Sequence, residues 1–188
     1  MSQSILSLKD ISVFQEKNPV LTNVNLEVKN GEFIYLIGKT GSGKSSFLKT
    51  LYADLPLTMG EGTIVDYNLR DLKEHDIPYL RRKLGVVFQD FQLLTDRNVN
   101  DNLRFVLKAT GWLDEQLIQQ KIDDVLNKVG LQNKGFKMTY EMSGGEQQRV
   151  DIARAMLNSP KMILADEPTG SLDPETSDEI MHLLFQIA

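Results

Sequence analysis

The sequence predicts an α/β fold: a core with a mostly parallel sheet, an N-terminal antiparallel β-subdomain and an inserted helical subdomain. Three observations predict it. The start of the chain alternates apolar and polar residues, short continuous apolar runs are followed by loops and helix-like segments, and the middle repeats apolar residues at helical spacing. A length of 188 residues is sufficient for one such domain.

The N-terminal elements are predicted first. Residues 5–13 and 20–28 alternate apolar and polar side chains, which is typical of antiparallel strands exposed on one face. Asn30 and Gly31 then mark a tight turn. Residues 33–37 form a continuous apolar run of strand length, which predicts a central strand covered on both faces.

The next segments repeat the pattern of strand, loop and helix. A glycine-rich loop leads into a predicted helix at about residues 44–53, followed by a short strand near residues 63–65 and an apolar run at residues 84–88. This order is typical of a parallel sheet.

The second half is predicted to be mainly helical at first. Residues 92–137 show apolar positions at helical spacing without a strand-like interruption. A helix is predicted from about Gly145 to just before Pro160, then a buried strand at residues 161–165 and a last helix from about Pro174. We therefore expect one domain over residues 1–188, with a helical subdomain at about residues 91–159 and the core at about residues 1–90 and 160–188.

Composition and charge exclude several classes of protein. The chain has 21 basic and 26 acidic side chains and a net charge of −5, so it lacks the basic surface that duplex nucleic acid requires. It contains no cysteine and two histidines, so any bound metal is expected to use oxygen ligands. No window of 18 apolar residues and no secretory signal are present, which predicts a cytosolic location.

A phosphate-binding loop is the strongest motif in the sequence. Its pattern is glycine, four residues, glycine, lysine and serine. Backbone N–H groups of such a loop surround phosphate oxygens, and the following helix directs its positive end at them. Lys44 is predicted to contact the β- and γ-phosphates, and the Ser45 hydroxyl to bind Mg²⁺. The predicted nucleotide-binding residues here are Gly38, Lys39, Thr40, Gly41, Ser42, Gly43, Lys44, Ser45 and Ser46.

Two adjacent carboxylates follow the last predicted strand. Asp166 and Glu167 are expected at the carboxyl edge of the sheet, where ligands bind in open α/β folds. Alone, this pair is typical of a solvated loop. Together with the phosphate loop, it predicts that Asp166 binds Mg²⁺ and that Glu167 accepts a proton from, or orients, the water that attacks the γ-phosphate.

A serine and two glycines, Ser143, Gly144 and Gly145, open another predicted helix, and composition alone indicates an N-cap. With the motifs above, the sequence resembles the ATP-binding cassette (ABC) ATPases, whose signature motif these residues match. The resemblance implies an ABC ATPase fold and a homodimer in which two ATP molecules lie between the subunits. Each signature motif then contacts the nucleotide held by the other subunit.

The resemblance assigns three further residues. Gln89 matches the family's Q-loop glutamine, which approaches Mg²⁺ and the attacking water and is therefore a catalytic candidate with Lys44 and Glu167. Asp173 matches the D-loop between the subunits. Phe14 falls near the position of the aromatic ring that stacks on adenine. A core residue remains the alternative for Phe14.

Within the family, residues 80–85, 93–102 and 165–170 resemble the bacterial FtsE-type cell-division subunits. This implies a peripheral location on the inner face of the membrane and a separate transmembrane partner of the FtsX type. Lipoprotein-release and macrolide-type exporters share these motifs and remain the alternative. A soluble ABC protein that acts on ribosomes or DNA, and a scaffold that binds ATP with little hydrolysis, fit the single acidic cassette and its motifs less well.

The sequence also departs from the family pattern. In the family, a switch histidine lies about thirty residues beyond the glutamate that corresponds to Glu167, and this sequence stops before that position. We therefore expect the chain to be C-terminally truncated, and we do not assign the role to His182, which lies too early. Met142 replaces the usual signature leucine, which conserves volume. Ser46 replaces a common threonine and keeps the hydroxyl.

Overall fold

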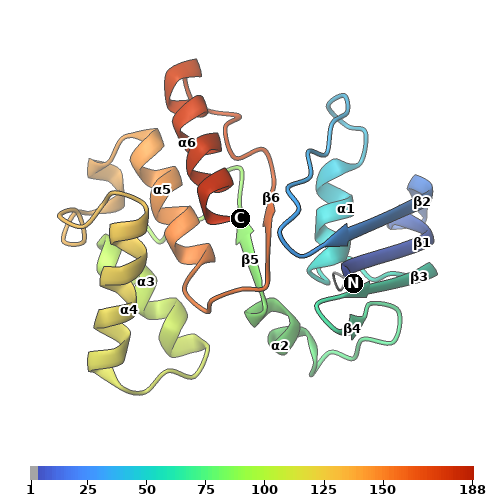
Figure 1. Ribbon diagram of the computed structural model, residues 1–188, viewed down its shortest axis with the longest axis horizontal. Coiled ribbons are helices and arrows are strands. Elements are labelled where there is room, and N and C mark those ends of the chain that lie inside the picture. The colour runs from blue at the N-terminus through green and yellow to red at the C-terminus, as the bar shows by residue number, and fades with distance from the viewer. Residues whose placement is uncertain (1–3) are drawn as a thin grey trace. The chain divides into compact units, whose positions relative to one another are not determined.

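The computed structural model describes residues 4–188, which divide into two compact units (Figure 1). One comprises residues up to Leu84 together with Ala188, and the other comprises Gly85–Ile187. Among residues 4–188 no helix is long and apolar enough to cross a bilayer.

The first unit contains a four-stranded sheet of order β2-β1-β3-β4, in which all neighbours are antiparallel. Leu6 pairs with Val28 and Leu8 with Leu26, which confirms the prediction of antiparallel strands in this part of the chain. The elements of this unit are β1 (Ser4–Gln15), β2 (Asn18–Lys29), α1 (Lys44–Leu51), β3 (Met59–Ile64), β4 (Tyr67–Asn68) and α2 (Ile77–Arg82).

Helix α1 packs against β1, and its C-terminal end is held by hydrogen bonds from a side chain. Phe47, Thr50 and Leu51 recur at helical spacing and are buried. At the C-terminal end, Arg81 donates from Nε to the Tyr52 carbonyl at 3.0 Å and from a terminal nitrogen to the Ala53 carbonyl at 3.2 Å. These bonds satisfy carbonyls that a helix end leaves without a partner.

The prediction of a buried strand at residues 33–37 is wrong. Residues 32–39 have no regular secondary structure, and the side chains of Tyr35 and Ile37 are 64% and 89% exposed. A strand needs a neighbour to complete its ladder, and the sheet of this unit includes only β1–β4. An apolar run shows that side chains favour burial but does not identify the element that covers them.

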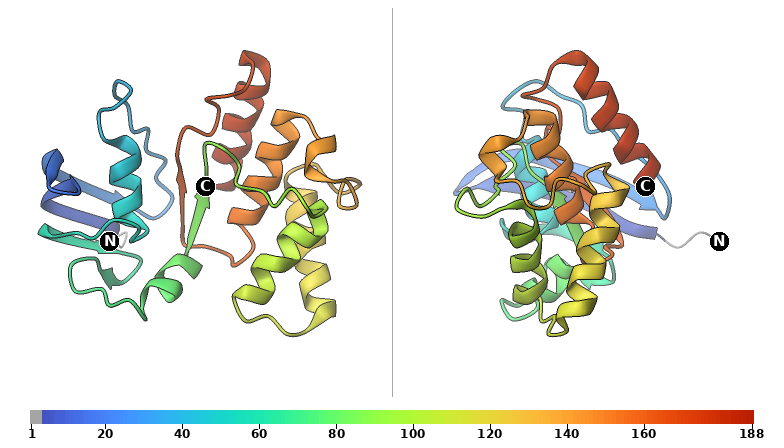
Figure 2. Two further views of the ribbon diagram at one scale, coloured as in Figure 1. Left: turned by 180° about the vertical axis from the view of Figure 1, so that it is seen from behind. Right: turned by 90° about the vertical axis from the view of Figure 1, so that its left-hand side faces the viewer.

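The second unit combines a two-stranded parallel sheet with four helices, which Figure 2 shows in colours from yellow-green to red. The predicted helical segment contains two helices, and the predicted strands and last helix are present. The prediction that the last strand is buried is only partly correct, because Leu164 alone in it is buried. The elements are β5 (Leu84–Val87), α3 (Val99–Ala109), α4 (Glu115–Lys128), a 3₁₀ turn (Thr139–Glu141), α5 (Gly144–Ala155), β6 (Met162–Ala165) and α6 (Pro174–Ile187).

The helices of the second unit share one apolar core. Helix α5 contacts α3, α4 and α6. Ile118, Ile122 and Val125 of α4 are fully buried at helical spacing, whereas Leu117 is 52% exposed, although it belongs to the apolar positions identified from the sequence. Asp114 caps α4 by accepting hydrogen bonds from two backbone N–H groups.

Candidate functional site

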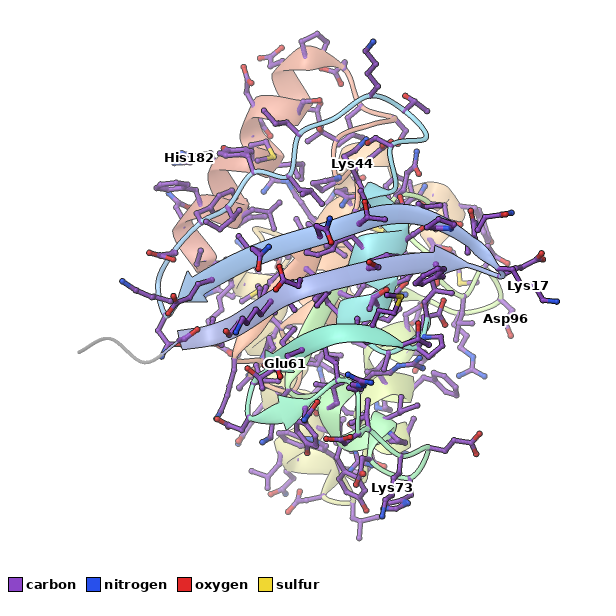
Figure 3. All side chains as sticks on the ribbon, turned by 90° about the vertical axis from the view of Figure 1, so that its right-hand side faces the viewer. Lys17, Lys44, Glu61, Lys73, Asp96 and His182 are labelled. Carbon is purple, nitrogen blue, oxygen red and sulfur yellow. The ribbon has the colours of Figure 1, made fainter. Side chains whose placement is uncertain are left out.

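The phosphate loop folds around the side chain of Lys44. Lys44 Nζ donates to the carbonyls of Gly38 at 3.0 Å and Lys39 at 3.2 Å, and the Ser42 N–H donates to the Lys39 carbonyl at 3.1 Å. These bonds place the ammonium over the loop at the start of α1, where Figure 3 labels Lys44. The loop residues predicted from the motif therefore lie together.

The N-terminal end of α1 suits an anion. Gly43 is the N-cap and has φ 94°, a left-handed conformation that glycine adopts without strain. As a glycine, the N-cap residue has no side chain with which to cap the helix. The first N–H groups of a helix carry a partial positive charge and attract phosphate. Ser45 and Ser46 lie in this first turn.

Phe14 lies near the turn between β1 and β2, whose Lys17 is labelled in Figure 3. Its side chain is half-buried and lines a cavity of about 520 Å³. The other lining residues are Glu16, Lys17, Leu55, Pro56 and Thr58. Phe14 is thus not fully enclosed by the core, and part of the ring borders space large enough for a nucleobase.

In the second unit, Gln89 and Glu167 come together from two different segments. Gln89 follows β5, Glu167 follows β6, and the Gln89 side-chain amide donates to Glu167 Oε2 at 3.1 Å. The strand ends are tied by the Asp166 N–H, which donates to the Val87 carbonyl at 3.0 Å. Glu167 has φ 45°, an uncommon conformation for this residue type. The arrangement directs one carboxylate oxygen at an amide and leaves the side chain exposed.

Ser143 and Glu146 cap the start of α5. The Glu146 N–H donates to Ser143 Oγ at 3.2 Å, and the Ser143 N–H donates to Glu146 Oε2 at 3.0 Å. Lys134 pairs with Glu146 at 2.9 Å. The hydrogen bond from Lys134, followed by that from the Ser143 backbone, lowers the pKa of Glu146, so this carboxylate stays ionised at the helix start.

The signature glycines permit close packing against the start of α6. A Cβ atom on Gly145 would lie 2.5 Å from Thr176 Cγ2, and one on Gly144 would lie 3.3 Å from a Leu172 methyl group. Asp173 accepts from the Thr176 N–H at 3.1 Å and from its hydroxyl at 2.6 Å, bonds that lower the pKa of Asp173. The signature motif and Asp173 are therefore held against each other within this unit.

Two residues that the motifs did not identify connect α5 to the segment after β5. Asp151 is completely buried, and its Oδ2 accepts from the Phe88 N–H at 2.7 Å. Arg154 bonds Asp151 and donates to the carbonyls of Phe91 and Gln92. The only sequence signal was a charged residue on the buried face of a helix.

Residues 4–188 contain no cluster of three or more histidine, cysteine, aspartate or glutamate side chains able to hold a metal ion. A hydroxyl (Ser45) and a carboxylate (Asp166) instead supply separate oxygen donors. Such donors suit Mg²⁺, which commonly keeps water and substrate phosphates as ligands. Each donor by itself has the oxygen chemistry that Mg²⁺ prefers.

The loop around Lys44 and the glycine-led start of α1 define a P-loop nucleotide-binding protein of the α/β class. The family model of the ABC transporter matches residues 21–170, and the chain belongs to this family.

Relatives and solved structures agree with the family. The cell division ATP-binding protein FtsE of Streptococcus pneumoniae is 41% identical over 98% of this chain and 80% of its own length. The methionine import ATP-binding protein MetN of Clostridium tetani is 36% identical over 97% of this chain and 57% of its own length. A dimeric ATP-binding cassette in a post-hydrolysis state, bound to ADP and Pi, has a TM-score of 0.82 and 34% identity, covering 95% of this chain and 81% of that one.

Proposed function

We propose that this chain is the ATP-binding and ATP-hydrolysing subunit of a membrane-associated ABC complex of the FtsE type. ATP-driven closure of a homodimer then moves a separate transmembrane partner of the FtsX type during cell division. The observation that carries the hydrolytic part is the 3.1 Å contact between the Gln89 amide and Glu167. The similarity to FtsE supports the cellular role, and the similarity to a dimeric cassette supports the homodimer.

In this proposal the phosphate loop holds the nucleotide. Backbone N–H groups of residues 38–46 bind its phosphates, and Lys44 neutralises charge on the β- and γ-phosphates. Phe14 stacks on the adenine through the part of its ring that borders the cavity. The half-buried ring supports this role over that of a core residue.

Hydrolysis requires a positioned water and neutralised phosphates. Glu167 accepts the proton of the attacking water, and Gln89 orients that carboxylate and the water. Ser45, Gln89 and Asp166 would supply oxygen ligands to Mg²⁺, and a bound Mg²⁺ would neutralise charge on the phosphates. Lys44 contributes to the same charge stabilisation.

The start of α5 is proposed to complete the site of the second subunit. The backbone N–H groups of Gly144 and Gly145 and the hydroxyl of Ser143 contact the γ-phosphate of the nucleotide bound by the partner. Asp173 lies at the same interface. The capping box and the ion pair of Glu146 support a preformed geometry for this contact.

Two substitutions test the catalytic assignment. Lys44→Ala is expected to abolish ATP binding, because the charge over the loop is lost. Glu167→Gln is expected to retain ATP, lose turnover and accumulate a closed dimer, because it keeps the shape of the side chain but cannot accept the proton. Lys49→Ala, which removes an exposed lysine from the same helix, is the control and is expected to behave as the parent. Parent-level turnover in Glu167→Gln would contradict the assignment of the base.

The cellular role is tested by the partner. Co-purification from membranes is expected to recover an integral protein of the FtsX type, and depletion of the chain is expected to block division. Recovery of a lipoprotein-release or macrolide-type permease, with normal division on depletion, would instead support the exporter alternative.

A further inference from the structure

We propose that Asp151 is a positioning residue that, through Arg154 and the Phe88 N–H, holds residues 88–92 so that the Gln89 amide reaches Glu167. We call residues 88–92 the Q segment. The inference rests on the proposed function of Gln89 and Glu167 in hydrolysis, and it assigns Asp151 no contact with nucleotide.

The burial of Asp151 is the first argument. Asp151 is the only ionisable side chain that is buried among residues 4–188. A buried carboxylate is costly unless both oxygens have partners, and here Oδ2 accepts the Phe88 N–H while Oδ1 bonds Arg154. Phe88 is 63 residues away in the chain, so the carboxylate joins α5 to a distant backbone.

Arg154 holds the other end of the Q segment. One terminal nitrogen donates to the Gln92 carbonyl at 2.6 Å, the other to the Phe91 carbonyl at 2.9 Å. The guanidinium carbon lies 5.3 Å from the centre of the Phe88 ring. A planar fork bonded to two successive carbonyls fixes their orientation as well as their position.

The backbone at the same carbonyls is strained. Phe91 has φ 58° and Gln92 has φ 46°, both in the left-handed region. That region costs about 1 kcal/mol or more per residue for side chains other than glycine and persists where the surroundings impose it. Arg154 binds these two carbonyls, and Asp151 orients Arg154.

Gln89 lies between the two anchored parts of the Q segment, so its position depends on both anchors. Phe88 is fixed by Asp151, Phe91 is fixed by Arg154, and the Gln89 amide donates to Glu167. Burial raises the pKa of Asp151 to about 7 against the opposing effects of Arg154 and the Phe88 N–H. A carboxyl held at such a cost adds little net stability, which fits a positioning role better than a stabilising one.

Two readouts on the natural full-length protein test the inference. In Asp151→Ala, hydrogen exchange of the Q segment amides is expected to rise at least tenfold. The kcat for ATP is expected to fall at least tenfold, with KM within twofold, because the phosphate contacts are unchanged. In a protein that already carries Gln89→Ala, adding Asp151→Ala is expected to change kcat less than twofold, because both substitutions act through the Gln89 amide. Asp151→Asn, which keeps an oxygen for the Phe88 N–H, is expected to restore part of kcat.

Asp101→Ala is the matched control, because Asp101 pairs with Arg104 at the same i,i+3 spacing at 3.0 Å but is half-exposed. It is expected to leave exchange of the Q segment and kcat unchanged. If Asp151→Ala does not fold, Arg154→Lys carries the test with the same expected readouts, because lysine keeps the charge but cannot bond both carbonyls as a planar fork.

The inference would be overturned if hydrogen exchange of the Q segment amides were the same in Asp151→Ala as in the parent. It would also be overturned if the fall in kcat of the double variant equalled the product of the falls in Asp151→Ala and Gln89→Ala. Failure of the proposed function is a separate result: Glu167→Gln and Gln89→Ala would then hydrolyse ATP at the parent rate. In that case the exchange measurement still decides whether Asp151 holds the segment.

Discussion

Replacement of Ser143 by alanine distinguishes two roles of this side chain: the cap of helix α5 and the proposed contact with phosphate. The hydroxyl accepts the Glu146 N–H at 3.2 Å, and Glu146 in turn bonds the Ser143 N–H and Lys134. Alanine removes the first of these bonds and leaves the other two. The loss for folding is therefore that of one N-cap acceptor, about 1 kcal/mol of unfolding free energy. For a domain of this size that lowers Tm by about 2–4 °C.

The expected loss of activity is larger. In the proposed dimer the Ser143 hydroxyl donates to an anionic phosphate oxygen, and a hydrogen bond to a charged group contributes about 1.5–3 kcal/mol. Its loss lowers turnover by about ten- to hundredfold. Glu146→Gln provides a comparison, because it keeps an oxygen for the Ser143 N–H while it weakens the ion pair with Lys134.

The matched control is Asp114→Ala on α4. Asp114 is also an N-cap and accepts from the N–H groups of Gln116 at 2.8 Å and Leu117 at 3.1 Å. Its removal is expected to lower stability by a similar amount, about 1 kcal/mol, without a loss of turnover. Thermal unfolding and steady-state ATP hydrolysis are measured on the same preparations, with dimer formation followed by light scattering.

Two results would refute this reasoning. Equal losses of turnover in Ser143→Ala and Asp114→Ala would show that activity follows stability alone. Parent-level turnover in Ser143→Ala, with the expected fall in Tm, would show that the hydroxyl is only a helix cap.

Gly60→Ala is expected to destabilise the first unit by more than about 2 kcal/mol, because φ is 86° and the new Cβ would lie 2.5 Å from Ile11 Cα. Gly111→Ala is the control: its φ is 96° but the space around it is open, so it is expected to cost about 1 kcal/mol. Equal urea midpoints for the two variants would contradict the steric argument. Burial raises the pKa of Asp151 to about 7 despite Arg154. Between pH of about 4 and about 7 the folded state therefore keeps a proton that the unfolded state has lost. As the pH rises through this range, the unfolding free energy of the parent is expected to fall relative to that of Asp151→Asn, which does not titrate at this position. A difference in unfolding free energy that stays constant from pH 5 to pH 8 would argue against that raised pKa.

The sequence predicted the elements whose signals are local. The antiparallel strands β1 and β2 follow from alternation, and α1 follows from the glycine-rich loop and the helix-like segment after it. The start of α5 at Gly144 follows from the capping preference of Ser143. Each of these features depends on residues within a few positions of one another.

Features that depend on distant partners were not predictable in the same way. The apolar run at residues 33–37 gave the character of its side chains but not their environment, and Ile37 is exposed. The contact of the Gln89 amide with Glu167 joins residues 78 positions apart, so spacing along the chain contains no signal for it. The family motifs assigned both residues to ATP hydrolysis, but only the fold of the second unit shows that their side chains are in contact.

Helix α5 is the element where the candidate roles meet. Its first turn holds Gly145 close to Thr176 beside Asp173, and its buried face carries Asp151 toward Phe88. A rigid helix transmits a displacement of one end to the other, because its backbone hydrogen bonds fix the rise per residue. If the signature motif contacts a second subunit, as proposed, a displacement of the first turn of α5 would therefore reach Asp151 and, through the Phe88 N–H, the Q segment that contains Gln89.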